Sequence, residues 1–226
     1  MSGRLISVAG PIGNLGDLSP RAVTALTEAD FWLVEDSRVS GKLGHHLAIK
    51  KPMRLLNEHT GPGKIAEYAD EIEAGSTAAL LTDAGTPGIS DPGALLTDLC
   101  LERDLEVDAI PGPSAVTTAL MLSGFFAQQF AFLGFLPRKE GAMKEQLGAF
   151  ADSTLTLVLF ESPFRVEKLA EVAYAALGSR RIAFCRELTK MHQQICRVTL
   201  PDMPTASTMP RKGEFTVVIE GKRRKA

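Results

Sequence analysis

The chain has 226 residues, with 25 Lys or Arg against 27 Asp or Glu, so its formal charge is −2 at neutral pH. This balance excludes a generally basic protein that coats nucleic acid. With 45% hydrophobic and 23% charged residues, the composition excludes a disordered chain and allows one large or two modest α/β domains.

In the first half, short apolar segments alternate with segments of helical spacing. Strands are expected at residues 5–9, 31–34, 77–81 and 107–110. Helices are expected after Ser19-Pro20, over residues 64–74, after Asp91-Pro92, and from Ser114 to Gly124. Strands that alternate with helices through short Gly/Pro loops predict a parallel sheet covered by helices on both faces. A ligand would then bind at the carboxyl ends of the strands.

Residues 109–137 contain no charged side chain and are long enough to suggest a membrane span. Pro111, Gly112, Pro113 and Gly124 interrupt this stretch. We therefore interpret it as a buried strand, a tight turn, a buried helix and another strand.

The second half restarts the pattern after Pro137, with residues 138–144 as a polar hinge before a candidate helix. A further helix should run from Ser162-Pro163 to Gly178, with strands at residues 154–160, 182–185, 194–199 and 215–219. Three strands after one helix indicate an α+β arrangement with some antiparallel pairing. The predicted organisation is therefore an N-terminal α/β domain, residues 1–136, and a C-terminal α/β domain with a mixed sheet, residues 137–226.

Three cysteines, Cys100, Cys185 and Cys196, form no CxxC pair, which disfavours a disulfide framework and a zinc site. The N-terminus lacks the apolar region of a signal peptide. We therefore expect a cytoplasmic protein.

Charge is unevenly distributed along the chain. Residues 37–64 hold six basic residues and one acidic one, residues 65–108 hold eleven acidic and one basic, and residues 210–226 hold six basic and two acidic. The two basic stretches could meet phosphates, or they could simply be solvated loops.

Unusual loops follow four of the expected strands, at residues 10–14, 35–38, 83–93 and 111–114. Any one of them could be a tight turn, but four in succession indicate close approach of backbone to a ligand. The chain has neither the G-x-G-x-x-G fingerprint nor a G-x-x-x-x-G-K-[ST] phosphate loop, so NAD enzymes, P-loop NTPases and the common Rossmann-type methyltransferases are disfavoured. It also lacks a G-x-S-x-G elbow and histidines at ligand spacing, so no metal is expected.

The motifs of these loops resemble those of the RsmI family, within the tetrapyrrole-methylase-like, or class III, S-adenosylmethionine methyltransferases. The similarity runs in order along the chain through DAGTPGISDPG (83–93), PIGNLGD (11–17), ED-S-R (35–38), PGPSA (111–115), GFLPRK (134–139), ESPFR (161–165), RELTK (186–190) and KGEF (212–215). Gly10 and Ser37 stand where the family usually has Thr, and residues 56–60 read LNEHT where a His-Glu-His-Asn pattern is common.

The resemblance implies methylation of the ribose 2′-hydroxyl of a cytidine in the decoding region of 16S rRNA, within the small ribosomal subunit. It also implies a homodimer, and two α/β domains with S-adenosylmethionine in the cleft between them. The cofactor-binding residues carried over by the resemblance are Pro11, Gly85, Thr86, Ile89, Ser114, Ala115, Phe160, Glu161 and Glu187.

Transfer to a ribose hydroxyl requires positioning of the oxygen and a base that accepts its proton. Asp36, Glu58 and His59 are the candidate bases, and Arg38 and Asn14 are candidates for orienting ribose or phosphate. Alternatively, Asp36 and Arg38 form a structural ion pair, and Glu58 and His59 are solvated loop residues.

Two other functions stay open. One is a C-methyltransferase acting on a tetrapyrrole, and the other is a ribosome assembly factor that keeps the fold without catalysis. Because aromatic residues are sparse in the basic stretch, recognition of an assembled subunit by shape fits better than reading of free RNA.

Overall fold

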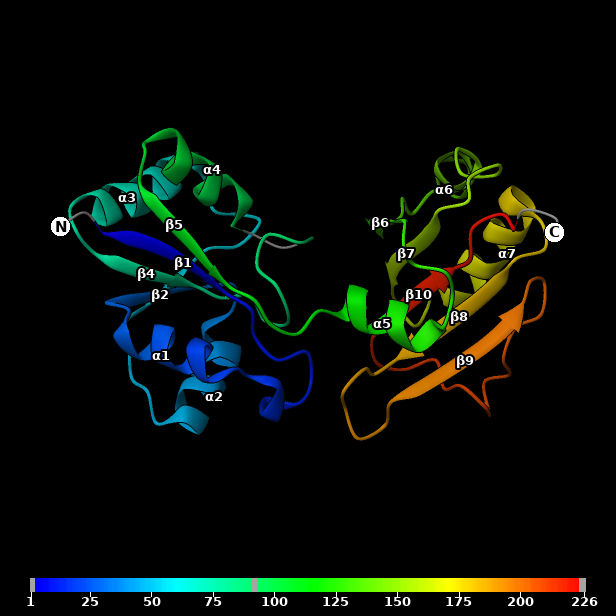
Figure 1. Ribbon diagram of the computed structural model, residues 1–226, viewed down its shortest axis with the longest axis horizontal. Helices are drawn as coiled ribbons and strands as arrows, with labels where there is room; N and C mark the ends of the chain where they lie inside the picture. The colour runs from blue at the N-terminus through cyan, green and yellow to red at the C-terminus, as the bar shows by residue number, and fades with distance from the viewer. Residues whose placement is uncertain (1–2, 91–92, 224–226) are drawn as a thin grey trace. The chain divides into compact units, whose positions relative to one another are not determined.

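The computed structural model describes residues 3–90 and 93–223, and the chain divides into two compact units, Met1–Ser114 and Ala115–Ala226 (Figure 1). The predicted boundary after residue 136 lies later than the observed one. Strand β6 (Phe130–Phe135) pairs with β7 (Thr156–Glu161), and helix α5 (Ala115–Ser123) packs on the same sheet. Both elements therefore belong to the second unit.

The first unit contains a five-stranded sheet of order β3-β2-β4-β1-β5, in which every pair is parallel. Its strands are β1 (Arg4–Val8), β2 (Phe31–Val34), β3 (Met53–Leu55), β4 (Thr77–Leu80) and β5 (Glu106–Ile110). The helices are a short 3-10 helix η1 (Leu15–Asp17), then α1 (Pro20–Glu28), α2 (Ser37–Leu47), α3 (Pro62–Glu73) and α4 (Ala94–Glu102). This arrangement confirms the predicted parallel sheet.

Helices cover both faces of this sheet, with α1 and α2 on one face and α3 and α4 on the other (Figure 1). Successive side chains of a strand point to opposite faces, so each strand contributes to two separate cores. Leu33 packs with residues of α3 and α4, whereas its neighbour Trp32 packs with α1. Trp32 is fully buried, and its indole Nε1 donates a hydrogen bond to the Leu26 carbonyl at 2.9 Å.

Helix α2 and strand β3 are not among the predicted elements. Asp36 caps α2 by accepting from the Arg38 backbone N–H, and Ala48 closes the helix in the left-handed conformation with φ 55°. The helix predicted after Asp91-Pro92 begins at Ala94, and these two residues themselves lie outside the described part of the chain.

The second unit contains a mixed sheet of order β6-β7-β10-β8-β9. Its remaining elements are α6 (Glu140–Gly148), α7 (Val166–Leu177), β8 (Arg181–Arg186), β9 (Gln194–Thr199) and β10 (Phe215–Ile219). Strands β6 and β7 are parallel, whereas β7, β10, β8 and β9 pair antiparallel in turn, as the predicted α+β arrangement requires.

Helices cover both faces of the second sheet as well. Leu159 and Phe184 face the core that α6 and α7 share, and Cys185 faces α5, whose Ala119 carbonyl lies 3.9 Å from its Sγ. The polar hinge expected at residues 138–144 is shorter than predicted, because α6 already begins at Glu140.

The uncharged stretch 109–137 holds the end of β5, a turn, the nine-residue helix α5 and strand β6, as predicted. The predicted burial is only partial, because Met121 of α5 is 80% exposed and Phe135 of β6 is 61% exposed. Within residues 3–90 and 93–223, no helix is long and apolar enough to cross a bilayer.

Candidate functional site

Loops at the carboxyl ends of β1, β4 and β5 meet in the first unit. The Gly10 N–H donates to the Gly85 carbonyl at 2.8 Å, and the Thr86 hydroxyl lies 3.5 Å from the Pro113 carbonyl. The Ala9 N–H extends the β1–β5 ladder by donating to the Ile110 carbonyl at 3.1 Å. Three of the four predicted ligand loops, at residues 10–14, 83–93 and 111–114, therefore meet at the carboxyl edge of the parallel sheet.

Glycines keep this surface open. Gly85 has φ +85°, a conformation that favours glycine, and a Cβ there would lie 3.3 Å from Ile12 Cγ2. A Cβ on Gly10 or Gly88 would have no atom within 4 Å. Beside them lie Pro11, half-buried, and Ile89, which is 48% exposed. This surface of bare backbone and apolar side chains suits an uncharged organic ring better than a phosphate.

Asp36 is held firmly by Arg38. Its carboxylate accepts the Arg38 backbone N–H at 2.8 Å and the guanidinium at 3.0 Å to Nε and 2.5 Å to the other nitrogen. These bonds, with the side-chain bonds contributing most, lower the pKa of Asp36 to about 2. A carboxylate with so low a pKa is a weak base, so the geometry favours the structural ion pair over proton abstraction.

A carbon-detected NMR titration of the Asp36 carboxyl group should give a midpoint near pH 2. In an R38A variant the midpoint should move up toward 3.8, the ordinary value. Because the folded pKa is depressed, the stabilisation is present above pH 3.8 and is lost as the pH falls toward 2. An unchanged midpoint in R38A would show that Arg38 is not the cause.

Glu58 and His59 lie in the turn that follows β3. The Asn57 side chain accepts the His59 backbone N–H at 3.0 Å, and the Thr60 hydroxyl accepts the Asn57 N–H at 2.9 Å. The Glu58 carboxylate lies 3.5 Å from His59 Nε2, and the two side chains are 83% and 85% exposed. Both groups are thus free to contact a substrate.

The other candidate for orienting substrate, Asn14, caps the 3-10 helix η1. Its side-chain oxygen accepts the Gly16 N–H at 3.0 Å, and its side chain is exposed.

A pocket of about 800 Å³ lies at the carboxyl ends of β2, β3 and β4. It brings together three of the predicted residues, Asp36, Glu58 and His59, but not Arg38 or Asn14. Two further carboxylates line it, Glu35 and Asp83, whose roles the sequence analysis does not assign. The signal available in the sequence is their position, since Glu35 comes directly after β2 and Asp83 comes three residues after the end of β4.

Glu35 and Asp83 lie close together in the lining of this pocket. Glu35 accepts a hydrogen bond from the Thr82 hydroxyl at 3.2 Å, and Asp83 accepts the Asp36 backbone N–H. Partial burial, and then the charge of Glu35, raise the pKa of Asp83. Two adjacent carboxylates of this kind are typical of a binding site.

In the second unit, Phe160 and Glu161 end strand β7. The Phe160 ring meets the Phe132 ring edge-on, with centroids 4.9 Å apart. The Glu161 carboxylate is almost fully buried, accepts the Ser162 N–H at 2.7 Å and lies 3.3 Å from the Arg165 guanidinium. Arg165 also donates to the Leu136 carbonyl at 3.0 Å, so Glu161 is part of a clamp that holds the loop after β6.

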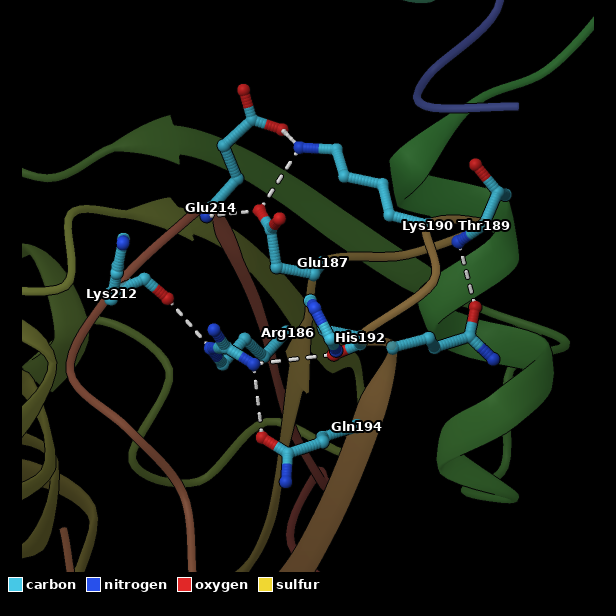
Figure 2. Close-up of polar contacts among 9 residues, drawn as sticks. Arg186, Glu187, Thr189, Lys190, His192, Gln194, Lys212 and Glu214 are labelled. Carbon is cyan, nitrogen blue, oxygen red and sulfur yellow. Dashed lines mark hydrogen bonds and ion pairs between the residues drawn. The ribbon is translucent and has the colours of Figure 1, made fainter. Parts of the chain in front are cut away.

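Glu187 belongs to a network that joins the RELTK and KGEF motifs (Figure 2). Its carboxylate accepts from Lys190 Nζ at 3.0 Å and from the Glu214 N–H at 2.9 Å. Arg186 donates to the Lys212 carbonyl at 2.6 Å, beside Gly213, where a Cβ would lie 2.5 Å from the Glu187 carboxylate. The last two residues carried over by the resemblance, Ser114 and Ala115, stand at the junction of the two units.

The family model for Tetrapyrrole (Corrin/Porphyrin) Methylases matches residues 4–204 of the chain. A protein named ribosomal RNA small subunit methyltransferase I from Synechocystis is 41% identical over 221 residues, 97% of this chain and 79% of the relative. The protein of the same name from Thermotoga maritima is 39% identical over 223 residues, 97% of this chain and 99% of the relative.

Solved structures with the same fold are more distant in sequence. The methyltransferase CobJ superimposes with a TM-score of 0.69 at 18% identity, covering 100% of this chain and 98% of CobJ. Diphthine synthase superimposes with a TM-score of 0.71 at 13% identity, covering 96% of this chain and 90% of that chain. At these identities the similarity concerns the fold alone.

Proposed function

Because the chain belongs to the tetrapyrrole methylase family and, within it, to the relatives named ribosomal RNA small subunit methyltransferase I, we propose that it methylates a cytidine ribose of 16S rRNA. The methyl donor is S-adenosylmethionine, and the acceptor is the 2′-hydroxyl of a nucleotide in the decoding region. The sequence identity over 97% of the chain is the observation that carries this proposal. We further propose that the enzyme acts in the cytoplasm as a homodimer.

The glycine-lined surface at the ends of β1, β4 and β5 fits the donor. Gly85 leaves room against Ile12 that a larger residue would fill, and Gly10 and Gly88 face open space. We assign the adenosine part of the donor to Pro11, Gly85, Thr86 and Ile89, with Ser114 and Ala115 beside them. In the second unit, we assign Phe160 and Glu187 to donor binding, while the clamped Glu161 would hold the loop after β6 in place.

The donor supplies an electrophilic methyl group on a sulfonium. In the transfer, the ribose 2′ oxygen forms a bond to the methyl carbon as the carbon–sulfur bond breaks, and the 2′ proton passes to a base. Of the three candidate bases, Asp36 is neutralised by Arg38, whereas Glu58 and His59 are exposed beside the pocket. We assign proton removal to the Glu58–His59 pair, and to Asp36 the role of holding Arg38 at the start of α2.

The two faces of the first sheet differ in charge, which indicates where RNA phosphates would lie. Helix α2 and the segment after it expose basic side chains, namely Arg38, Lys42 and Lys50. Helices α3 and α4, on the opposite face, expose Glu67, Asp70, Glu73, Asp98 and Glu102. Phosphates are attracted to the first set and repelled by the second. We propose that α2 faces the RNA backbone.

The test is to incubate the protein with radiolabelled S-adenosylmethionine and small ribosomal subunits, or naked 16S rRNA, from cells that lack the gene. Label on one cytidine ribose of the subunit sample is expected, and its absence from naked rRNA would support recognition by shape. A protein that binds the donor in calorimetry but labels neither sample would refute the assignment. Labelling of a tetrapyrrole instead would favour the C-methyltransferase alternative.

A further inference from the structure

The pocket at the ends of β2, β3 and β4 has two kinds of wall. One is apolar and is formed by Leu56, Ile65, Leu95 and Leu96. The other carries carboxylates, and of the lining residues that the structure describes none is Lys or Arg. Its volume, about 800 Å³, is within the range of pockets that enclose small organic ligands.

The acidic and apolar lining of this pocket determines which part of a nucleotide can bind in it. A phosphate would meet Glu35, Asp36, Glu58 and Asp83, of which only Asp36 is paired with an arginine. A flat, uncharged ring could instead lie against the leucine side chains and donate hydrogen bonds to the carboxylates. The pocket therefore favours a nucleobase that carries an amino group and disfavours the phosphates of the RNA backbone.

Among pyrimidines, only cytosine carries such an amino group, at its N4, and carboxylate side chains accept from it. Uracil presents a carbonyl oxygen at the same position, which a carboxylate repels. We propose that the pocket receives the cytosine base of the target nucleotide and that Glu35 and Asp83 accept its N4 amino protons. This inference rests on the proposed function and adds the residues that determine the choice of base.

The surroundings of the pocket agree with this placement. Arg38 and Lys42 follow Asp36 on α2, so the nucleotide's phosphates would lie on a basic surface just outside the acidic pocket. Glu58 and His59 line the pocket, and their side chains are more than four-fifths exposed. The ribose of a bound cytidine would lie beside these two side chains. Enzymes that act on a stacked nucleotide commonly extrude it into a pocket of this kind.

The first test uses small subunits that carry either cytidine or uridine at the labelled position. The wild-type protein should favour cytidine by about 10-fold or more in kcat/KM, since one good base contact contributes about 1–3 kcal/mol of discrimination. E35Q and D83N keep the size of the side chain but remove its charge, and each should reduce this ratio by about 10-fold. E102Q, which alters an exposed carboxylate on α4, is the matched control and should leave the ratio unchanged. A ratio near one in the wild type, or an unchanged ratio in both E35Q and D83N, would overturn the inference.

A second measurement does not depend on methyl transfer. Cytidine and uridine nucleosides are titrated into the protein while NMR follows amide signals of Leu56, Gly88 and Gly93, which line the pocket. Cytidine should bind more tightly than uridine and shift these signals, and E35Q should remove the difference. Equal affinities for the two nucleosides would refute the base pocket even if subunits were methylated. A cytidine preference without any transfer to rRNA would instead refute the proposed function and leave the pocket assignment standing.

Discussion

Replacing Arg165 by methionine is expected to destabilise the second unit by about 3–5 kcal/mol at neutral pH, because it leaves a buried charge without its partner. The Glu161 side chain is only 1% exposed, and among the described residues its Oε2 has no hydrogen-bond partner and is paired only with the Arg165 guanidinium, 3.3 Å away. The same substitution removes the bonds from Arg165 to the Leu136 and Pro137 carbonyls. Denaturant unfolding monitored by circular dichroism would measure the loss.

The loss of stability caused by R165M should become smaller as the pH falls. Burial raises the pKa of Glu161, while Ser162 and Arg165 oppose the shift. Without Arg165, the pKa should rise further. A carboxyl group with a raised folded pKa binds more protons in the folded state, so stability is lost as the pH rises above the ordinary value of 4.5. The deficit of R165M should therefore shrink on acidification toward pH 4.5.

The matched control lies on helix α7, which Arg165 precedes as the N-cap residue. Lys168 forms exposed ion pairs with Glu140 and Glu171, and such surface pairs contribute little to stability. K168M should unfold at nearly the same denaturant concentration as the wild type. If R165M unfolded at the same denaturant concentration as K168M, the contacts between the ESPFR and GFLPRK motifs would not contribute to stability.

The regular elements of the fold could be predicted because their apolar spacing is local. The strand at residues 31–34 and the helix over residues 64–74 both lie where the sequence indicates. Helix α2 was not predicted because its sequence, SRVSGKLGHHL, has two glycines and few apolar residues. It is stabilised instead by the Asp36 cap, and Gly44 allows close packing, since a Cβ there would lie 3.0 Å from the Ile49 carbonyl oxygen and 3.4 Å from the Trp32 ring.

The remaining differences come from contacts between distant segments. The boundary expected after residue 136 follows a Pro-containing loop, but β6 pairs with β7, which lies beyond helix α6. Glu35 and Asp83 meet because β2 and β4 are neighbours in the sheet, an order that their sequence positions do not specify. Burial of Glu161 likewise depends on its pairing with Phe215.

Replacing His59 by glutamine is expected to lower kcat for methyl transfer by about 10²- to 10⁴-fold, the usual contribution of a general base. An imidazole in its neutral form can accept the 2′ proton, and the Glu58 carboxylate, 3.5 Å from Nε2, would stabilise the cation that forms. E58Q should therefore reduce kcat less than H59Q. Calorimetry should find donor binding unchanged in both variants.

The effect of D36N on kcat separates the candidate bases. Asp36 has a pKa of about 2 and is bound to Arg38, so it is a weak base, and D36N should lower kcat far less than H59Q does. If D36N lowered kcat by about 10²-fold or more while H59Q left it unchanged, the base would be Asp36. The ion pair with Arg38 would then have to open when RNA binds, releasing the carboxylate for catalysis.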